Sequence, residues 1–269
     1  MKKILITGAN SYIGTSFEKY MNDNYPNEYS IDTVDMIGNG WKEKDFSSYD
    51  SVFHVAGIAH QKETRKNAAL YYQVNRDLAI ETACKAKEEG VKQFVFLSSM
   101  SIYGLETGII TKESQPTPKT NYGKSKWQAE QSILNMMDDS FHICILRPPM
   151  VYGEGCKGNY QVLVKLATIL PILPTYYNQR SMIHIDRLSK CVKEYVDTNA
   201  NGVYIPQDEK YVCTCDMIIN IRTQMGKRFK LVNILNPFIA LSVLFTLKGR
   251  KAFGNLIYVN NHRSNTYEE

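Results

Sequence analysis

Short apolar runs alternate with amphipathic helical patterns along this chain, and that alternation constrains its fold more than any other feature. Strand patterns lie at residues 2–7, 30–35, 51–55, 92–98 and 141–146, and helical patterns lie between them near 12–22, 66–89 and 122–137. Strands that take turns with helices form a parallel sheet whose two faces are covered by those helices. The sequence therefore predicts an α/β fold with a doubly wound parallel sheet.

The first strand runs directly into a glycine-rich turn and then into a helix. Glycine lets a backbone turn tightly and approach an anion, and the N–H groups at the start of the next helix face that anion. An ordinary turn between a strand and a helix is the alternative. We favour a phosphate-binding cradle whose contact residues are Gly8, Asn10, Ser11, Tyr12, Ile13 and Gly14.

A tyrosine and a lysine four residues apart carry the most informative chemical signal. Tyr122 and Lys126 are one helical turn apart, so both side chains stand on the same face of the predicted helix. A phenol has an ordinary pKa of about 10 and becomes a useful base at neutral pH only if a nearby cation lowers that pKa. Lys126 and a positively charged ring beside it could together supply such a charge. The same spacing also arises by chance on amphipathic helices, so it needs support from other segments.

A third segment joins an apolar strand to a run of hydroxyl side chains. The strand that begins at Phe94 ends at Ser98 and Ser99, and active groups of open parallel sheets lie at the carboxyl ends of strands. Together the three segments resemble the extended branch of the short-chain dehydrogenase/reductase superfamily, the nucleotide-sugar epimerases and dehydratases. The match covers roughly residues 1–190. It implies a Rossmann-type sheet, a small C-terminal substrate-binding lobe, and Ser99, Tyr122 and Lys126 as the catalytic set.

Cofactor choice is argued from the second strand. A carboxylate at its end, Asp35, would accept hydrogen bonds from the adenosine ribose and repel the 2′-phosphate of NADP, so NAD is favoured. A solvated turn aspartate is the alternative for this residue. By resemblance, the Asp45-Phe46 pair would lie at the adenine, and Ala56, Gly57 and Ile58 would form the turn beneath the dinucleotide. Ser11 is a departure from the family, because it stands where the middle glycine of the turn usually sits.

The resemblance also implies contacts further along the chain. Asn75 matches a family asparagine near the active site, with a helix-surface or capping role as the alternative. Pro148 and Val151 match the strand end that lines the nicotinamide. Asn159 and Arg180 match residues that contact the nucleotide diphosphate, where a guanidinium can bind phosphate oxygens through two hydrogen bonds. No metal site is predicted, because the six cysteines lack the pairing of a zinc site.

Beyond Pro148 and Pro149 the alternation breaks into shorter pieces separated by glycine and proline. We expect residues 1–153 to form the NAD-binding Rossmann domain that carries the catalytic residues. Residues 154–269 should form mainly the substrate-binding lobe, with a segment near 181–198 returning to the Rossmann sheet. The family would further imply a homodimer built from the helices near 66–89 and 122–137.

Composition limits the partners of the chain. Its 269 residues carry a net charge of +5, which suits an anionic substrate, and no basic tract is interleaved with aromatic residues as in nucleic-acid-binding proteins. Nucleic acid is therefore not expected as a partner. The chain starts with a strand of the fold and not with a long apolar secretory segment, so a cytoplasmic location is the default. Residues 234–247 are apolar but too short to span a bilayer, and peripheral membrane contact is the minor alternative to a packed helix.

The activity that these residues favour is NAD-dependent 4-epimerisation of a nucleotide sugar, either UDP-glucose and UDP-galactose or their N-acetyl forms. Tyr122 would remove the C4 hydroxyl proton, directly or through Ser99, and a transient 4-keto sugar would take its hydride back on the other face. An NAD(P)H-dependent reductase of a 4-keto nucleotide sugar is the alternative. Met100 and Ser101 stand where family dehydratases carry an Asp-Glu pair, which argues against dehydration. A non-catalytic dinucleotide-binding protein is disfavoured by the intact catalytic set.

Overall fold

A parallel sheet forms the centre of the protein. The computed structural model describes residues 1–59, 61, 63–259 and 266–267. In this part of the chain the largest sheet has seven strands in the order β13-β10-β6-β4-β3-β1-β2. Their bounds are β1 (Lys2–Thr7), β2 (Tyr29–Val34), β3 (Ser51–His54), β4 (Gln93–Leu97), β6 (His142–Leu146), β10 (Gly202–Tyr204) and β13 (Thr266–Tyr267). All neighbours pair in parallel except β13, which runs antiparallel to β10.

The predicted doubly wound α/β fold is confirmed, and β1, β2, β3, β4 and β6 match the five predicted strands to within one residue at each end. The strand order reverses between β1 and β3. In sheets of this kind ligands bind at such a reversal, in the crevice outside the carboxyl ends of the strands. The turns that follow β1 and β3 are therefore the places to look for a site.

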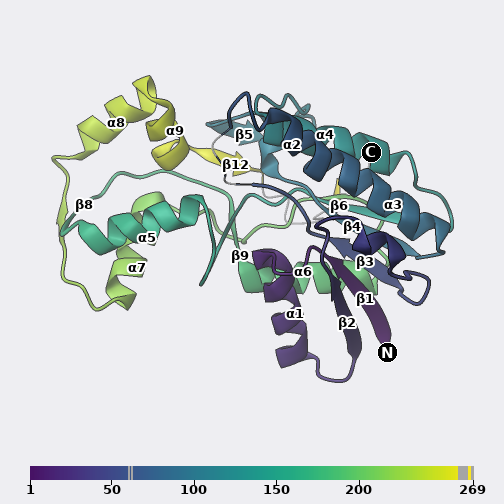
Figure 1. Cartoon of the computed structure of the whole chain (residues 1–269). Coiled ribbons are helices and arrows are strands. Elements are labelled where there is room, and N and C mark those ends of the chain that lie inside the picture. The colour runs from purple at the N-terminus through teal and green to yellow at the C-terminus, as the bar shows by residue number, and fades with distance from the viewer. Residues whose placement is uncertain (60, 62, 260–265, 268–269) are drawn as a thin grey trace.

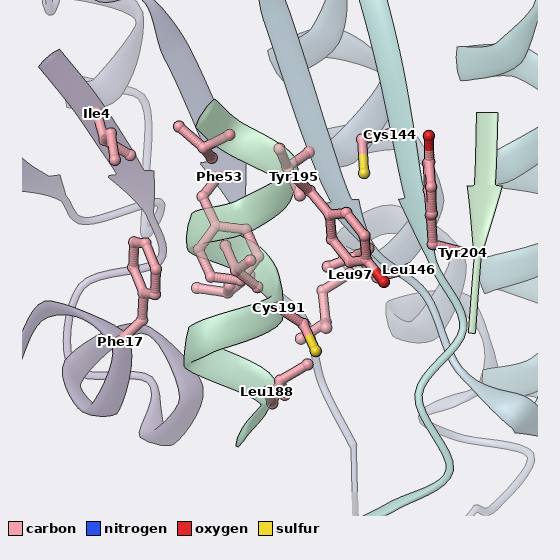
Figure 2. Close-up of a cluster of buried hydrophobic side chains, with 14 of the residues drawn as sticks. Ile4, Phe17, Phe53, Leu97, Cys144, Leu146, Leu188, Cys191, Tyr195 and Tyr204 are labelled. Carbon is pink, nitrogen blue, oxygen red and sulfur yellow. The ribbon is translucent and has the colours of Figure 1, made fainter. Parts of the chain in front are cut away.

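Helices cover both faces of the sheet (Figure 1). One face carries α1 (Tyr12–Asn24) and α6 (Ile185–Asp197), whose apolar side chains join a cluster with residues of β1, β3, β4 and β6. Figure 2 shows part of this cluster, in which Phe17 and Leu188 reach towards the sheet. The other face carries α3 (Leu78–Glu88) and α4 (Asn121–Leu134), which pack through small residues such as Ala83 and Ala129.

Alternation along the strands explains how one sheet serves two cores. Ile4 and Ile6 of β1 point to the α1 and α6 side, whereas Leu5 between them points to the α3 and α4 side. β4 repeats this pattern with Val95 on one side and Phe94 on the other. Successive side chains of a strand point to opposite faces, and both faces are buried here, so the strands read as continuous apolar runs.

The predicted helix over residues 66–89 is split into three pieces. α2 (Ala68–Tyr72) is followed by a π-helical turn over Gln73–Asp77 before α3 begins. The π-helical turn contains Asn75, whose side chain is fully buried. Short π-helical turns inside helices often mark functional sites, because they change which side chains point inwards.

Most of the later chain forms a lobe on one side of the sheet (Figure 1). Its helices are α5 (Asn159–Ile169), α7 (Thr214–Gln224), α8 (Asn236–Phe245) and α9 (Leu247–Phe253). Three pairs of short parallel strands accompany them: β8 (Ile172–Pro174) with β11 (Lys230–Val232), β5 (Gly108–Ile110) with β12 (Leu256–Tyr258), and β7 (Met150–Tyr152) with β9 (Met182–His184). The segment near 181–198 thus contributes β9 to a small sheet and α6 to the face of the main one. Residues 260–265 and 268–269, which end the expected lobe of residues 154–269, lie outside the described residues.

A buried ion pair joins the elements that surround the crevice. The Arg147 guanidinium, at the end of β6, donates two hydrogen bonds to Glu130 Oε2 on α4, at 2.7 and 3.0 Å. Arg147 also donates to the Tyr103 hydroxyl at 3.1 Å, and the Ser98 hydroxyl donates to the other oxygen of Glu130. Glu130 is fully buried and Arg147 is 6 % exposed. These contacts link β4, β6, α4 and the 3₁₀ turn over Met100–Tyr103.

We predict that Glu130→Ala lowers the free energy of unfolding by about 3–5 kcal/mol, because Arg147 would stay buried without its counter-charge. Urea denaturation followed by circular dichroism measures the change. Lys19→Ala is the control, since Lys19 forms an exposed pair with Asp23 and should cost less than about 1 kcal/mol. A cost for Glu130→Ala as small as that of the control would contradict this role of the pair.

Candidate active site

Two turns meet at the strand reversal. Gly8, which follows β1, has a φ of +117°, and a Cβ built on it would lie only 2.8 Å from the backbone nitrogen of Ala56, which follows β3. The N–H groups of Gly8 and Ala9 both donate to the carbonyl of Val34, the last residue of β2. The glycine therefore permits a contact between backbones that a side chain would block, and the three strand ends are held together.

The predicted phosphate cradle lies at the start of α1. Ser11 is the N-cap of α1, and its Oγ accepts a hydrogen bond from the N–H of Gly14 at 3.1 Å. The hydroxyl proton of Ser11 can still be donated to another acceptor, such as a phosphate oxygen. A Cβ on Gly14 would lie 2.7 Å from that Oγ. Asn10 adopts a left-handed conformation with φ 64° and completes the tight turn. The Tyr12 hydroxyl donates to the carbonyl of Glu154 at 2.9 Å, and Ile13 is half-buried against the core.

The carboxylate predicted to choose the cofactor lies beside this cradle. Asp35 is exposed, directly follows β2, and accepts a hydrogen bond from the N–H of Ile37 at 3.0 Å, which fixes the direction of its carboxylate. Asp32 instead accepts from the Tyr49 hydroxyl. Asp45 is exposed, and the hydrogen bonds from Ser47 hold its pKa below the ordinary value.

Phe46 is placed in the core and not at a surface. Its ring is fully buried in the cluster beneath α3, and its N–H donates to the Glu89 carboxylate at 2.5 Å. Phe46 therefore anchors the segment that presents Asp45. Any contact of this pair with an adenine would come through Asp45.

Asn75 ties the turn after β3 to the helix that carries the tyrosine. Its Oδ1 accepts from the N–H of Ile58 at 2.8 Å, and its amide donates to the Ile58 carbonyl at 3.1 Å and to Ser125 Oγ at 3.3 Å. A Cβ on Gly57 would lie 2.9 Å from Asn75 Oδ1 and 3.4 Å from Lys126 Nζ. Ala56, Gly57 and Ile58 thus form a fixed turn against the lysine, and Asn75 is a buried clamp.

Ser99, Tyr122 and Lys126 converge at the carboxyl end of β4. Ser99 caps the 3₁₀ turn after this strand, with its Oγ accepting from the N–H of Ser101 at 3.1 Å. The Tyr122 side chain is hydrogen-bonded to that of Ser99. Lys126, 4 % exposed, donates to the carbonyl of Leu97 at 2.8 Å. The three predicted side chains are therefore brought together by a strand end and one face of α4.

Burial shifts the pKa values of both Tyr122 and Lys126. Burial raises the pKa of Tyr122, and the Ser99 hydrogen bond opposes that rise only in part. Burial also lowers the pKa of Lys126 from 10.5 to about 7, although Glu130 favours the charged form. The expectation that Lys126 and a positively charged ring together lower the pKa of Tyr122 stays a prediction, since within the chain itself burial is the largest influence on both pKa values.

The sequence did not reveal two residues that position Tyr122. The Glu63 carboxylate accepts hydrogen bonds from the N–H groups of Asn121 and Tyr122, at 2.9 and 3.0 Å, and so caps the start of α4. Gly123 lies against the serine turn, since a Cβ there would be 2.7 Å from the carbonyl of Ser101. A glycine next to the tyrosine was the available signal for the close approach. No local pattern pointed to Glu63, which lies more than fifty residues away from its partners.

Pro148 and Val151 lie on the opposite wall of this region. Pro148 directly follows Arg147 and is buried, and its carbonyl accepts from the N–H of Met100 at 2.9 Å. Val151 is half-buried in β7 and packs against the core beside α1. The Pro148 contact holds the strand end of β6 next to the serine turn.

The two residues predicted to bind a diphosphate lie in the lobe. Asn159 is exposed at the first position of α5, directly after Gly158. Arg180 is half-buried, and its guanidinium donates to the carbonyl of Gly254 at 2.8 Å, while burial lowers its pKa. The hydrogen bond of Tyr12 to Glu154 connects this region with the start of α1. In the described part of the chain no cluster of three or more His, Cys, Asp or Glu side chains is placed to hold a metal ion.

The family follows from a comparison with known proteins. A family model described as NAD dependent epimerase/dehydratase family matches residues 4–170, which include the glycine turn, Ser99, Tyr122 and Lys126. The chain belongs to this family. It is therefore an enzyme fold built to hold a nicotinamide dinucleotide, as the resemblance implied. The close contact of Gly8 with Ala56 and the start of α1 at the strand reversal fit such a group, because the backbone without a Cβ permits a close approach and the positive end of the helix would face the phosphates.

The sequence identities between this chain and individual known proteins are low. The UDP-glucose 4-epimerase of Vibrio cholerae is 27% identical over 253 residues, which cover 84% of this chain and 76% of the relative. The N-acetyl-alpha-D-glucosaminyl-diphospho-ditrans,octacis-undecaprenol 4-epimerase of Escherichia coli O157:H7 is 24% identical over 254 residues, covering 87% and 76%. The dTDP-4-dehydrorhamnose reductase of Bacillus anthracis, solved with NADP, has the same fold, with a TM-score of 0.68, 17% identity and coverage of 94% and 99%.

We predict that the stability of this enzyme rises with pH above 7 because of Lys126. Its folded pKa of about 7 lies below the ordinary 10.5, so between these values the unfolded chain binds the extra proton and raising the pH favours folding. Relative to Lys126→Met, the wild-type free energy of unfolding should increase towards a slope of about 1.4 kcal/mol per pH unit between pH 7 and 10. Urea denaturation of both proteins at several pH values measures the difference. Parallel pH profiles would show that Lys126 keeps its proton in the folded state.

Proposed function

We propose that this protein is an NAD-dependent 4-epimerase of a sugar diphosphate, with a nucleotide sugar as substrate. The observation that carries the proposal is the convergence of Ser99, Tyr122 and Lys126 beside the turn of Gly8 and Ala56. A base, a hydroxyl donor and a cation thus lie next to the place where the family holds its nicotinamide. Relatives that are 4-epimerases by name and cover most of this chain support the same reaction.

The chain's own residues divide the proton chemistry. Tyr122 takes the proton of the C4 hydroxyl, directly or through Ser99, and Ser99 Oγ donates to the oxygen as it becomes a carbonyl. Lys126 lies against Gly57 and holds the ribose hydroxyls. A bound NAD would supply the hydride acceptor for C4, and its positively charged ring would add charge that favours the Tyr122 phenolate. After the 4-keto sugar has rotated to present its other face, Tyr122 would return its proton to the C4 oxygen, and because the hydride also returns to C4 the reaction involves no net oxidation.

The substrate would enter from the lobe side. Arg180 and Asn159 bind the diphosphate, and the N-terminal end of α5 adds backbone donors next to Asn159. The sugar then extends towards Ser99 and Tyr122, which leaves the group beyond the diphosphate in the lobe made by α5, α7, α8 and α9. UDP-sugars are the first substrates to test, since the Vibrio relative is named for one. The Escherichia coli relative is named for a sugar diphosphate on a polyprenol, so that carrier is the second.

A 4-keto sugar reductase is the second candidate, and the raised pKa of Tyr122 is the observation that favours it. The same serine, tyrosine and lysine would serve a reductase, with Tyr122 as proton donor. Its raised pKa keeps the phenol protonated, which suits that role.

NAD is the proposed cofactor in preference to NADP. Asp35 follows β2 next to the carbonyl that receives Gly8 and Ala9, where the adenosine ribose of a Rossmann cofactor lies. Its carboxylate would repel a 2′-phosphate. A homodimer through the faces of α3 and α4, a cytoplasmic location, and the division into a Rossmann domain and a substrate lobe stay predictions.

We expect the purified protein to interconvert UDP-glucose with UDP-galactose, or the two N-acetyl forms, without added reductant. Chromatography of the sugar nucleotides should show conversion beyond the amount of bound cofactor. Tyr122→Phe should lower turnover by at least about a hundredfold, because the base is lost, while bound NAD measured after denaturation stays the same. No conversion together with consumption of NADH or NADPH by a 4-keto nucleotide sugar would replace the epimerase by the reductase. Substantial turnover by Tyr122→Phe would remove Tyr122 as the base.

We also predict that Asp35→Ala reduces the preference for NAD over NADP by about tenfold, or ~1.4 kcal/mol, because one like-charge repulsion is removed. Isothermal titration of both dinucleotides gives the ratio of dissociation constants. Asp32→Ala is the matched control, since Asp32 lies three residues earlier, on β2 itself, and accepts a hydrogen bond from the Tyr49 hydroxyl. An unchanged ratio in Asp35→Ala would place the ribose elsewhere.

A further inference from the structure

The helix α8 exposes apolar side chains that the described part of the chain leaves uncovered. Phe238, Leu241 and Phe245 recur at spacings of three and four residues and are 68, 56 and 71 % exposed, and Ile234 just before the helix is 75 % exposed. None of the ten residues of α8 is buried. The sequence from Leu231 to Leu247 contains no charged residue. Figure 1 shows this apolar helix at the outer end of the lobe.

Contacts at both ends hold α8 in this position. Before the helix, the Thr175 hydroxyl donates to Asn233 at 2.5 Å and accepts from the Asn236 amide at 3.0 Å. After it, the Arg250 guanidinium donates to the carbonyl of Leu244 at 3.1 Å. The following helix packs closely, since a Cβ on Gly249 would overlap the backbone of α8. The exposed face is therefore a built surface and not a frayed end.

Basic residues border the apolar segment on both sides. Lys227, Arg228 and Lys230 precede it, and Lys248, Arg250 and Lys251 follow it. Lys230 and Lys248 are exposed, whereas Lys251 pairs with Glu106 at 3.4 Å. An apolar helix between cations matches the two layers of an anionic membrane surface, whose headgroups attract lysine and whose acyl chains accept phenylalanine and leucine.

The length of α8 and the charges that flank it indicate what covers its apolar face. A helix of ten residues is about 15 Å long, half of what a bilayer core requires, so α8 can lie in the interface but cannot span it. No helix in the described residues is long and apolar enough to cross a membrane. A second copy of the chain would also cover the face, but basic residues flank the apolar segment on both sides, so either orientation of two such segments would bring like charges together.

We propose that α8 is an interfacial anchor that docks the lobe on an anionic lipid bilayer. Ile234, Phe238, Leu241 and Phe245 enter the boundary between headgroups and acyl chains, while Lys230 and Lys248 remain at the phosphates. This proposal does not depend on the reaction that the enzyme catalyses. It places the side of the protein that carries Arg180 next to the membrane, because the carbonyl of Gly254 that receives Arg180 directly follows α9.

Sedimentation of the full-length protein with vesicles tests the anchor. It should pellet with vesicles of phosphatidylglycerol and phosphatidylcholine in equal amounts, and much less with phosphatidylcholine alone. The double variant Phe238→Ser with Leu241→Ser should lose this binding, and Phe238→Leu with Leu241→Met, which keeps the face apolar, should retain it. The double variant Lys230→Glu with Lys248→Glu should weaken vesicle binding by about tenfold or more. The control Lys230→Arg with Lys248→Arg, which keeps both charges, should not weaken it.

Each variant is compared with wild type by circular dichroism and by its content of bound dinucleotide, so that loss of the fold is recognised. If the serine variant does not fold, the paired lysine variants still decide the question, because they change only exposed charges. Equal binding to neutral and anionic vesicles, or no binding by wild type, would overturn the proposal. So would a wild-type dimer in analytical ultracentrifugation that the serine variant dissociates without any vesicle binding, since α8 would then be a contact between two copies.

Discussion

The arrangement of the site depends on the buried ion pair between Glu130 and Arg147. Glu130 lies one turn after Lys126 on α4, and Arg147 directly precedes Pro148 at the end of β6. Ser98, the neighbour of Ser99, donates to the same carboxylate. The helix that carries the tyrosine and lysine is therefore fixed to the two strand ends that it faces. A charge left without its partner in this interior would be costly, so these elements keep their places together.

An apolar contact at this position could be equally stable, so stability alone does not explain why an ion pair is present. The directional hydrogen bonds of the pair explain it better. The guanidinium donates through two nitrogens to one carboxylate oxygen and through a third to Tyr103, so rotation or sliding of α4 would break several hydrogen bonds at once. The close packing of α4 against the serine turn requires that the helix keep this position along its axis. Gly123 lies against the serine turn with no room for a methyl group, and small displacements at a reacting centre are expensive. The pair thus stabilises a position more than it stabilises the fold.

Local sequence was enough for five strands of the sheet and for the meeting of the candidate residues at one strand end, and packing over long distances decided the rest. The five strands were readable because strands buried on both faces are continuous apolar runs, and the strand-end rule brought Ser99 to Tyr122. β10 has only three residues and was missed. Glu63 was missed because its partners come from a distant helix. The opposing effect of burial on the pKa values of Tyr122 and Lys126 could not be read from their spacing, because burial depends on packing over long distances.

The two parts of the protein use apolar residues differently. In the body, apolar side chains fill clusters on both faces of the sheet, and their burial drives folding. The lobe has a smaller cluster around Leu163 and Met217, and α8 adds exposed apolar surface that contributes little to folding. The proposed contact with a lipid bilayer explains that exposed apolar surface better than a contribution to the stability of the fold does. Arg180 is bonded to the carbonyl just after α9, so an anchored α8 and α9 would also fix the guanidinium that meets the substrate diphosphate. Docking and substrate binding would then stabilise the same conformation of the lobe.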